Sequence, residues 1–303
     1  MLSNPTILVF TDFKEPSDFA LKSAEVIRKK VGGKIHVTHV SDLSVQCDWI
    51  SQEASYIFQS ERLTLDLLKS LEKMMAEQIR RCEVECTSNV ALGLVYGGLM
   101  DSIAKTKPDI VFMGHKIHSH GLFNLGGIVA KIVASSSVPV FVTKKVLSSP
   151  FGKIAGLVDP CDLTRPVIST TEELSFLLSA EPEIISLWRK VTPPFPKIHP
   201  FDNSTIVKMD EDEKEIVLTG MKSAISKKLD THTKCKIKVG VTDELQVAYH
   251  LVNILQEDQV DVAIMQRHQK KIIDRMMIGS ETKRMIELFT GNLLVLPPGG
   301  NHV

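Results

Sequence analysis

The sequence predicts an α/β protein built from two repeated domains, each a parallel β-sheet with helices on both faces. Strands and helices alternate along the chain, and the expected strands read as short continuous apolar runs. Such runs are typical of parallel strands that are buried on both faces. The order of elements then recurs, so that Asp159 stands 147 positions after Asp12, each at the end of a strand. A repeat this long indicates a duplicated domain and not a solenoid.

The first half, expected to span residues 1–147, is read from its hydrophobic periodicity. Its expected strands are Ile7–Phe10, Ile35–Val40, the alternating stretch Cys82–Cys86, Asp109–Met113 and Val138–Thr143. Its expected helices are Ser17–Val31, Ser51–Arg81, Leu99–Lys105 and Asn124–Ala134. Apolar residues recur along these helices at helical spacing, and Gly32 with Gly33 ends the first of them. Crossovers between such parallel strands are expected to be right-handed.

The second half, expected to span residues 151–303, repeats this order after a linker around Lys145–Gly152. Its expected strands are Lys153–Val158, Glu183–Trp188, Cys235–Val241, Asp261–Met265 and Asn292–Leu296. The expected helices include Lys208–Leu229 and one that begins at Gly279 and Ser280. The loop from Thr192 to Pro200 carries four prolines and is interpreted as a surface loop.

Composition excludes some classes of protein. Lys plus Arg equals Asp plus Glu at 36 each, which gives no basic surface for nucleic acid. The five cysteines are an odd and sparse set, which argues against a disulfide framework and for a reducing compartment. The first residues do not resemble a signal peptide, and the apolar runs are too short to span a bilayer. We therefore expect a cytoplasmic protein without membrane partners.

Two stretches resemble the universal stress protein family in its tandem form. The stretch LVFTDFKEPSDFALKSAEVIRKKVGGKIHVTHV, from Leu8, is similar to the family's first strand, first helix and second strand. The stretch from Asp109 to Lys145 is similar to its fourth strand, fourth helix and fifth strand, and the second half matches more weakly. The resemblance implies five-stranded parallel sheets of order 3-2-1-4-5. It also implies an internal pseudo-dimer with the two fifth strands as its seam, and a homodimer as a further form.

The resemblance also implies where an adenine nucleotide would bind. ATP-binding members carry the pattern G-x2-G-x9-G-[ST] after the fourth strand, an Asp after the first strand, and backbone at the end of the second. Asp12, Val40 and Gly114 hold three of these places in the first half. Ile117 replaces the second glycine, Gly127 keeps the third, and Ile128 replaces the hydroxyl residue.

In the second half the four positions of the pattern keep only the third glycine and the hydroxyl. They read Gln266, Gln269, Gly279 and Ser280, and Asp159 takes the place of Asp12. Ser280 has a second interpretation, which we favour, as the cap of the helix that follows. Gln266 and Gln269 either bind a ligand or are exposed polar residues.

The replaced positions matter because a bound phosphate needs inward N–H groups, close backbone approach and hydroxyl donors. Isoleucine resists positive φ and cannot donate a hydrogen bond, and one lost charge-assisted bond costs roughly 1.5–3 kcal/mol. We therefore expect weak or no triphosphate binding in the first half, with the nucleoside end kept by Asp12. Asp12 is also open to interpretation as a turn residue that bonds its own backbone.

Two further clusters have residue types that could carry chemistry. His115, His118 and His120 share one loop and could bind zinc as part of a metal-dependent enzyme, but a solvated loop is favoured because no cysteine pair completes the set. Cys82 and Cys86 are spaced too widely for a C-x-x-C motif and are interpreted as buried strand residues.

The expected function is a stress-response sensor or scaffold with a degenerate site for ATP or AMP. No catalytic arrangement stands out in the sequence, so we expect no enzyme centre. The alternative is an ATP- or AMP-binding switch that hydrolyses ATP slowly.

Overall fold

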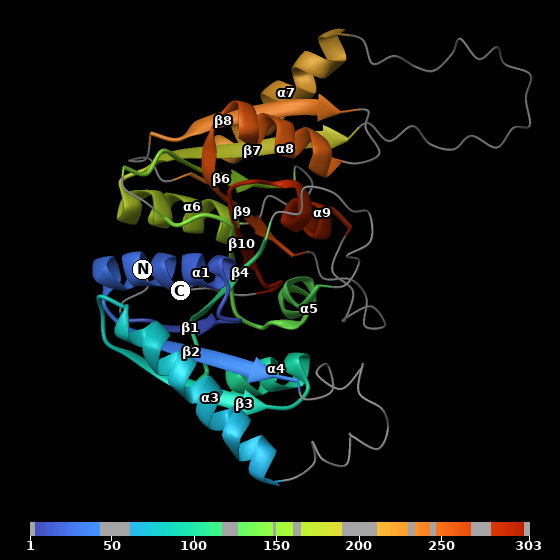
Figure 1. Cartoon of the computed structure of the whole chain (residues 1–303). Coiled ribbons are helices and arrows are strands. Elements are labelled where there is room, and N and C mark those ends of the chain that lie inside the picture. Colours follow the sequence, from blue (N-terminus) through green and yellow to red (C-terminus); the bar gives the residue numbers. More distant parts are fainter. Residues whose placement is uncertain are drawn as a thin grey trace, which may run out of the picture.

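The computed structural model describes nine stretches of the chain (Figure 1). They are residues 4–42, 61–116, 127–147, 150–159, 165–189, 211–229, 234–242, 247–267 and 280–299. None of the helices in these stretches is both long and apolar enough to cross a membrane.

The described strands form one ten-stranded sheet of order β3-β2-β1-β4-β5-β10-β9-β6-β7-β8. The first half supplies β1 (Thr6–Phe10), β2 (Lys34–Ser41), β3 (Cys86–Leu92), β4 (Ile110–Gly114) and β5 (Val140–Thr143). The second half supplies β6 (Lys153–Leu157), β7 (Glu181–Arg189), β8 (Lys236–Thr242), β9 (Val260–Gln266) and β10 (Asn292–Leu296). Each half has the order 3-2-1-4-5 with parallel neighbours, so the predicted fold class is confirmed.

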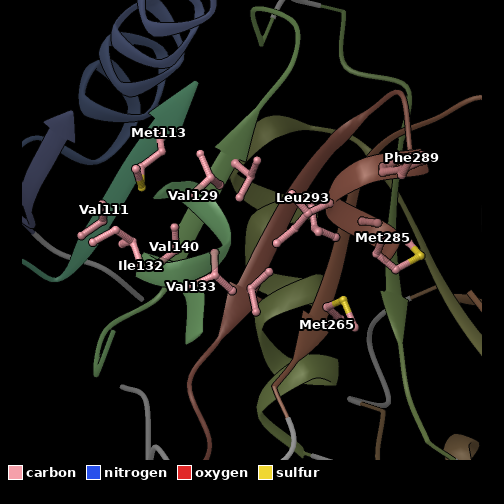
Figure 2. Close-up of a cluster of buried hydrophobic side chains, with 14 of the residues drawn as sticks. Val111, Met113, Val129, Ile132, Val133, Val140, Met265, Met285, Phe289 and Leu293 are labelled. Carbon is pink, nitrogen blue, oxygen red and sulfur yellow. The ribbon is translucent and has the colours of Figure 1, made fainter. Parts of the chain in front are cut away.

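Helices cover both faces of the sheet (Figure 1). One face carries α1 (Glu15–Val31), α3 (Glu61–Arg80), α6 (Arg165–Leu178) and α7 (Glu211–Ser226). The other carries α4 (Val95–Thr106), α5 (Ile128–Ser135), α8 (Val247–Glu257) and α9 (Ser280–Leu288). Each face has one buried apolar cluster that draws residues from both halves. Figure 2 shows part of the second cluster, with Val140 of β5 and Leu293 of β10 in its middle.

Helix α1 illustrates why these segments form helices. Pro16 stands in its first turn, where the missing N–H costs nothing, and Glu15 and Asp18 are acidic residues at the positive end of the helix dipole. Three basic residues occupy the last turn, and Gly32 ends the helix at φ 77° while its N–H bonds Arg28 O. The buried face of the helix, which includes Ala20 and Ala24, then lies against the sheet.

The two halves have hydrogen bonds at equivalent positions. In the first half, Thr11 N donates to Thr38 O at 3.0 Å, and in the second half Val158 N donates to Ile185 O at 3.0 Å. Val158 lies 147 positions after Thr11, and Ile185 lies 147 positions after Thr38. These bonds tie the end of the first strand to the second strand in each half. The duplication inferred from the order of elements therefore extends to individual backbone contacts.

The two halves join through antiparallel pairing of β5 with β10, which confirms the predicted seam. Phe141 pairs with Leu294 at the centre of the seam. The two hold equivalent places, because Phe141 pairs with Phe112 on β4 and Leu294 pairs with Ile264 on β9. The seam is therefore isologous, as in a two-fold dimer, and it pairs what would be an exposed edge in each half.

Polar contacts fasten the seam at its end. The side chain of Asn292 is fully buried, and its Oδ1 accepts Lys144 N at 2.9 Å and Lys145 N at 3.2 Å. The buried amine of Lys144 donates to the carbonyls of Ile286 and Phe289, where α9 ends. These bonds satisfy backbone groups that the helix and strand termini would otherwise leave unpaired.

The predicted strand Cys82–Cys86 is wrong. The third strand is β3, which begins at Cys86, and the residues before it form a turn after α3. Cys82 N bonds Ile79 O at 2.9 Å, which continues the helix end and not a ladder. Glu83 forms an ion pair with Lys29 on α1. The alternating acidic and apolar residues therefore belong to a turn and not to a strand.

Helix limits also differ from expectation. Helix α4 begins at Val95, four residues before the predicted Leu99, because its first turn carries glycines that weaken the helical pattern. The expected starts at Ser51 and Asn124 lie outside the described residues, as does the proline-rich loop from Thr192.

We predict that Asn292→Ala destabilises the protein by about 1–3 kcal/mol, because two backbone N–H groups at the seam lose their acceptor. Urea unfolding followed by circular dichroism measures the change. Asn253→Ala, at an exposed position on α8, is the control and should leave the free energy of unfolding unchanged within about 0.5 kcal/mol. Equal effects of the two substitutions would contradict the role given to Asn292.

A second prediction concerns pH. Burial lowers the pKa of Lys144 from 10.5 to about 8 in the folded protein. Between these values the unfolded chain keeps a proton that the folded chain has lost, so stability rises as pH increases through this window. Lys144→Met removes this contribution. Urea unfolding at about pH 7.5 and about pH 9.5 should show a smaller rise for the variant than for the wild type.

Candidate functional site

The candidate site lies where strand order reverses in the first half, between β1 and β4 at their carboxyl ends. Ligands of doubly wound sheets gather in the crevice at this point. Asp12 follows β1, Gly114 ends β4, and Val40 lies near the end of β2. Gly127 precedes α5. These residues lie at strand ends and at a helix start, and their role in binding stays a prediction.

A hydrogen-bond network that includes two hydroxyl groups lies at the end of β1. Ser17 Oγ donates to Lys14 O at 2.7 Å, which uses its only proton. Thr11 Oγ1 lies 3.0 Å from Ser17 Oγ and is therefore the donor between them. Thr11 Oγ1 in turn accepts Phe13 N at 3.0 Å. The network joins the end of β1 to the first turn of α1 and satisfies its members without a ligand.

Asp12 takes part in the same turn. Its Oδ1 accepts Lys14 N at 3.1 Å, and its Oδ2 lies 3.7 Å from Lys14 Nζ, with the carboxylate side chain 58% exposed. The bond from Lys14 N is the contact expected of a turn-forming Asp, which is one of the two interpretations of Asp12 given above. The exposed carboxylate is held by contacts that solvent screens, and its role toward a nucleoside stays a prediction.

An aromatic pair lies beside Asp12. Phe13 adopts φ 59°, and its ring centroid lies 4.4 Å from that of His39. His39 is buried, and its Nδ1 lies 2.8 Å from Thr11 O, so Nδ1 carries a proton for that carbonyl. Ser186 occupies the equivalent place 147 positions later and donates its Oγ proton to Val158 O at 2.9 Å. His39 on β2 therefore contacts the end of β1 twice, through the ring of Phe13 and through Thr11 O.

Sequence reasoning missed Thr11, Ser17, Phe13 and His39 as site residues. A hydroxyl residue at the end of a strand, followed by another in the first turn of the next helix, was the available signal. It carried little weight because Ser and Thr are common at helix starts for capping alone.

The two glycines kept from the family pattern have different structural reasons. A Cβ on Gly114 would lie 2.1 Å from the backbone carbon and oxygen of Pro16, so glycine is required for α1 to approach β4. A Cβ on Gly127 would meet nothing within 4 Å. Gly127 caps α5 at φ −52° without a side-chain hydrogen bond. Gly114 is therefore explained by packing alone, whereas Gly127 is not.

The residues around the glycines are apolar. Ile128, at the position of the family's hydroxyl residue, is half-buried and packs against the core cluster of its face. Val40 is 6% exposed and belongs to the same cluster. The first turn of α5 thus has backbone N–H groups with no side-chain cap, and its Ile128 side chain packs with the core.

The second half brings fewer predicted residues together. Asp159 is exposed after β6, and Ser280 is the first residue of α9. Gln266 is half-buried and its Nε2 donates to Pro297 O at 3.0 Å, so its amide is engaged within the fold. Gln269 and Gly279 lie outside the described residues.

The histidine cluster cannot be assembled from the described residues. His115 follows β4 with its N–H bonded to Thr143 O at 2.8 Å, whereas His118 and His120 lie outside the described stretches, as does Ile117. Within the described part of the chain, no three His, Cys, Asp or Glu side chains are grouped so that they could hold a metal ion.

The two glycines provide a matched pair for mutagenesis. Gly114→Ala should cost about 3 kcal/mol or more, because backbone atoms of Pro16 cannot yield to the new methyl group. Gly127→Ala should change stability by less than about 1 kcal/mol, because the site is open and φ is ordinary. Thermal and urea unfolding measure both. A Gly114→Ala variant as stable as wild type would contradict the packing role.

Comparison with known proteins places this geometry in a family. Residues 4–144 match the model of the universal stress protein family. A universal stress protein from Archaeoglobus fulgidus is similar over 99% of this chain and 100% of its own, with TM-score 0.63 and 16% identity. A candidate universal stress protein from Pseudomonas aeruginosa is similar over 97% of this chain and 93% of its own, with TM-score 0.63 and 14% identity.

No curated protein matches the chain in sequence. The two structural likenesses have low identity and show a shared fold across both halves, while the family model identifies the first half directly. Residues 4–144 therefore form a domain of the universal stress protein family, and the second half repeats the same fold.

Proposed function

We propose that the chain is a stress-response sensor or scaffold whose first half keeps a degenerate site for an adenine nucleotide such as AMP or ATP. The observation that carries the proposal is the hydrogen-bond network at the end of β1, where Ser17 Oγ donates to Lys14 O and Thr11 Oγ1 bonds Ser17 Oγ. A site built mainly to grip a ligand leaves such donors free to point at it. The proposed site keeps the position of a nucleotide, while the hydroxyl groups of Thr11 and Ser17 are already engaged within the fold.

The nucleoside end of the site is the better preserved part. Asp12 is exposed beside Phe13, and its only described partner is the neighbouring Lys14. A carboxylate in this position can exchange a weak surface contact for hydrogen bonds from ribose hydroxyl groups. This supports weak recognition of a nucleoside, in agreement with the resemblance.

The phosphate end has lost its side-chain donor. Ile128 stands where the family pattern has Ser or Thr, and its side chain packs with the core. The uncapped N–H groups at the start of α5 still favour an anion through the helix dipole. That feature supports the second candidate, an ATP- or AMP-binding switch with slow hydrolysis. The backbone N–H groups alone do not replace the hydroxyl donor that the family pattern has at the position of Ile128.

The remaining parts of the proposal concern organisation. We propose domains at residues 1–147 and 151–303, which act as an internal pseudo-dimer through β5 and β10. The sparse cysteines favour a cytoplasmic location. The isologous seam already occupies the edge strand of each half, so a homodimer would form through another surface. A metal-dependent enzyme that uses the loop of His115, His118 and His120 stays the least favoured alternative, because no cysteine pair in the sequence completes a zinc site.

The proposal is tested by restoring the missing hydroxyl. Ile128→Thr should raise affinity for ATP by about one decade, because one charge-assisted hydrogen bond is worth roughly 1.5–3 kcal/mol. Ile128→Val keeps the branched shape without a hydroxyl and is the matched control, expected to leave ATP affinity unchanged. Calorimetric titration of ATP, AMP and adenosine measures the affinities, and melting temperature follows binding independently.

For the wild type we expect ATP to bind no more than a few times tighter than AMP, since the triphosphate gains few contacts. Preference for ATP by roughly a hundredfold or more would contradict a degenerate site and favour the switch. Absence of any nucleotide binding would remove the nucleotide part of the proposal and leave the scaffold.

A further inference from the structure

The antiparallel seam brings the end of a strand in one half close to the end of a helix in the other half. Helix α5 leads into β5, and α9 leads into β10, so each helix ends shortly before its strand begins. Because β5 and β10 run in opposite directions, each of them ends beside the start of the other. Figure 1 shows α5 and α9 on either side of this seam, and both pack on the same buried cluster.

Lys144 of the first half caps the helix of the second half. It follows β5 and is 7% exposed, and its amine donates to Ile286 O and Phe289 O at the end of α9. Phe289 is the first residue after α9, and its N–H bonds Met285 O at 3.1 Å. A cation is favoured at this place because the carbonyl end of a helix carries partial negative charge.

Arg267 of the second half makes the reciprocal contact. It follows β9, and its N–H is fixed at the end of β10 by a bond of 2.9 Å to Leu296 O. Its half-buried guanidinium reaches into the first half, where Nη2 donates to Ser136 O at 3.2 Å. Ser136 is the first residue after α5 and is 1% exposed, and its N–H bonds Ile132 O at 2.8 Å. The second half therefore caps the helix of the first.

The two capped carbonyls are equivalent in the repeat. Ser136 and Phe289 lie 153 positions apart, as do Phe141 and Leu294, which pair at the centre of the seam. In the described part of the chain, the buried Nε of Arg267 has no hydrogen-bond partner. Such a group costs free energy, so packing alone does not explain an arginine at this position. The bond to the end of α5 does explain it.

The amino end of each capped helix carries positions of the family pattern. Gly127 and Ile128 stand at the start of α5, where the backbone N–H groups have no side-chain cap, and Ser280 begins α9. Helix α5 has eight residues, so its two ends are about 12 Å apart. A hydrogen-bonded helix of this length moves as one body, so a bond at its carboxyl end also fixes the direction of its first N–H groups.

We propose that the two halves cap each other's helices crosswise, and that Arg267 is thereby a positioning residue for the first-half site. A change at the end of β9, where Gln266 holds the first position of the pattern, then acts on the start of α5 in the other half. The effect on a nucleotide rests on the proposed function, whereas the crossed caps themselves do not.

The crossed caps are tested by hydrogen–deuterium exchange with mass spectrometry on the full-length protein. Arg267→Met removes the donor, and residues 131–137 should then exchange roughly tenfold faster, because a charge-assisted bond no longer opposes local opening. The end of α9 should keep its rate. Lys144→Met should give the reverse pattern, with faster exchange at residues 285–290 and an unchanged end of α5.

Two further variants serve as controls. Arg267→Lys keeps a cationic donor and should restore most of the protection of α5. Lys105→Met, at an exposed position on α4, removes one positive charge and should change neither helix end. The crossed caps are overturned if Arg267→Met speeds exchange only in its own half, or speeds it equally at both helix ends, as general destabilisation would.

The positioning role is tested by calorimetric titration of ATP and adenosine in the Ile128→Thr background. Adding Arg267→Met should weaken ATP binding roughly threefold or more, because the N–H groups of α5 lose their direction, while adenosine affinity stays the same. Unchanged ATP affinity beside faster exchange of α5 would overturn the positioning role alone. If neither variant binds ATP, the nucleotide part of the proposed function fails and the positioning role fails with it, while exchange still decides the crossed caps.

Discussion

The pairing of β5 with β10 is the constraint on which the rest of the structure depends. Each half ends its sheet with a short, fully buried strand whose outer edge cannot remain exposed. Antiparallel pairing about Phe141 and Leu294 covers both edges at once and makes one sheet of two halves. It also lets the helices on each face share a core across the seam, as Figure 2 shows for Val140 and Leu293. The isologous geometry of a dimer is thereby built into one chain.

Several residues at the candidate site have roles in the fold itself. Gly114 remains because α1 packs against it, and Thr11 and Ser17 remain bonded because they join β1 to α1. Neither contact requires a nucleotide. Ile128 packs against the core cluster of its face. Gly114 is thus explained by the packing of α1, and Ile128 contributes to the core of its face.

Most of the fold was predictable from the sequence because buried parallel strands have a plain signal. Runs such as Ile7–Phe10 and Asn292–Leu296 are apolar without interruption, and the structure keeps them within one residue. The third strand was misplaced because β3 lies at the edge, where Thr87, Ser88 and Asn89 are exposed and polar. The alternating residues before it belong to a turn, and periodicity alone cannot separate these two cases. At the candidate site, the position of Gly114 was predicted from the family pattern. The reason that glycine is needed there was not predicted, because the close approach of Pro16 depends on tertiary packing.

Hydrogen–deuterium exchange of the backbone amides tests most directly whether β5 and β10 make the two halves one unit. If the seam is the common support, the amides of both strands should exchange at similar rates, among the slowest in the chain, and lose protection together as denaturant is added. Early exchange of β10 and its half, while β5 and the first half stay protected, would show two independent domains and contradict the account.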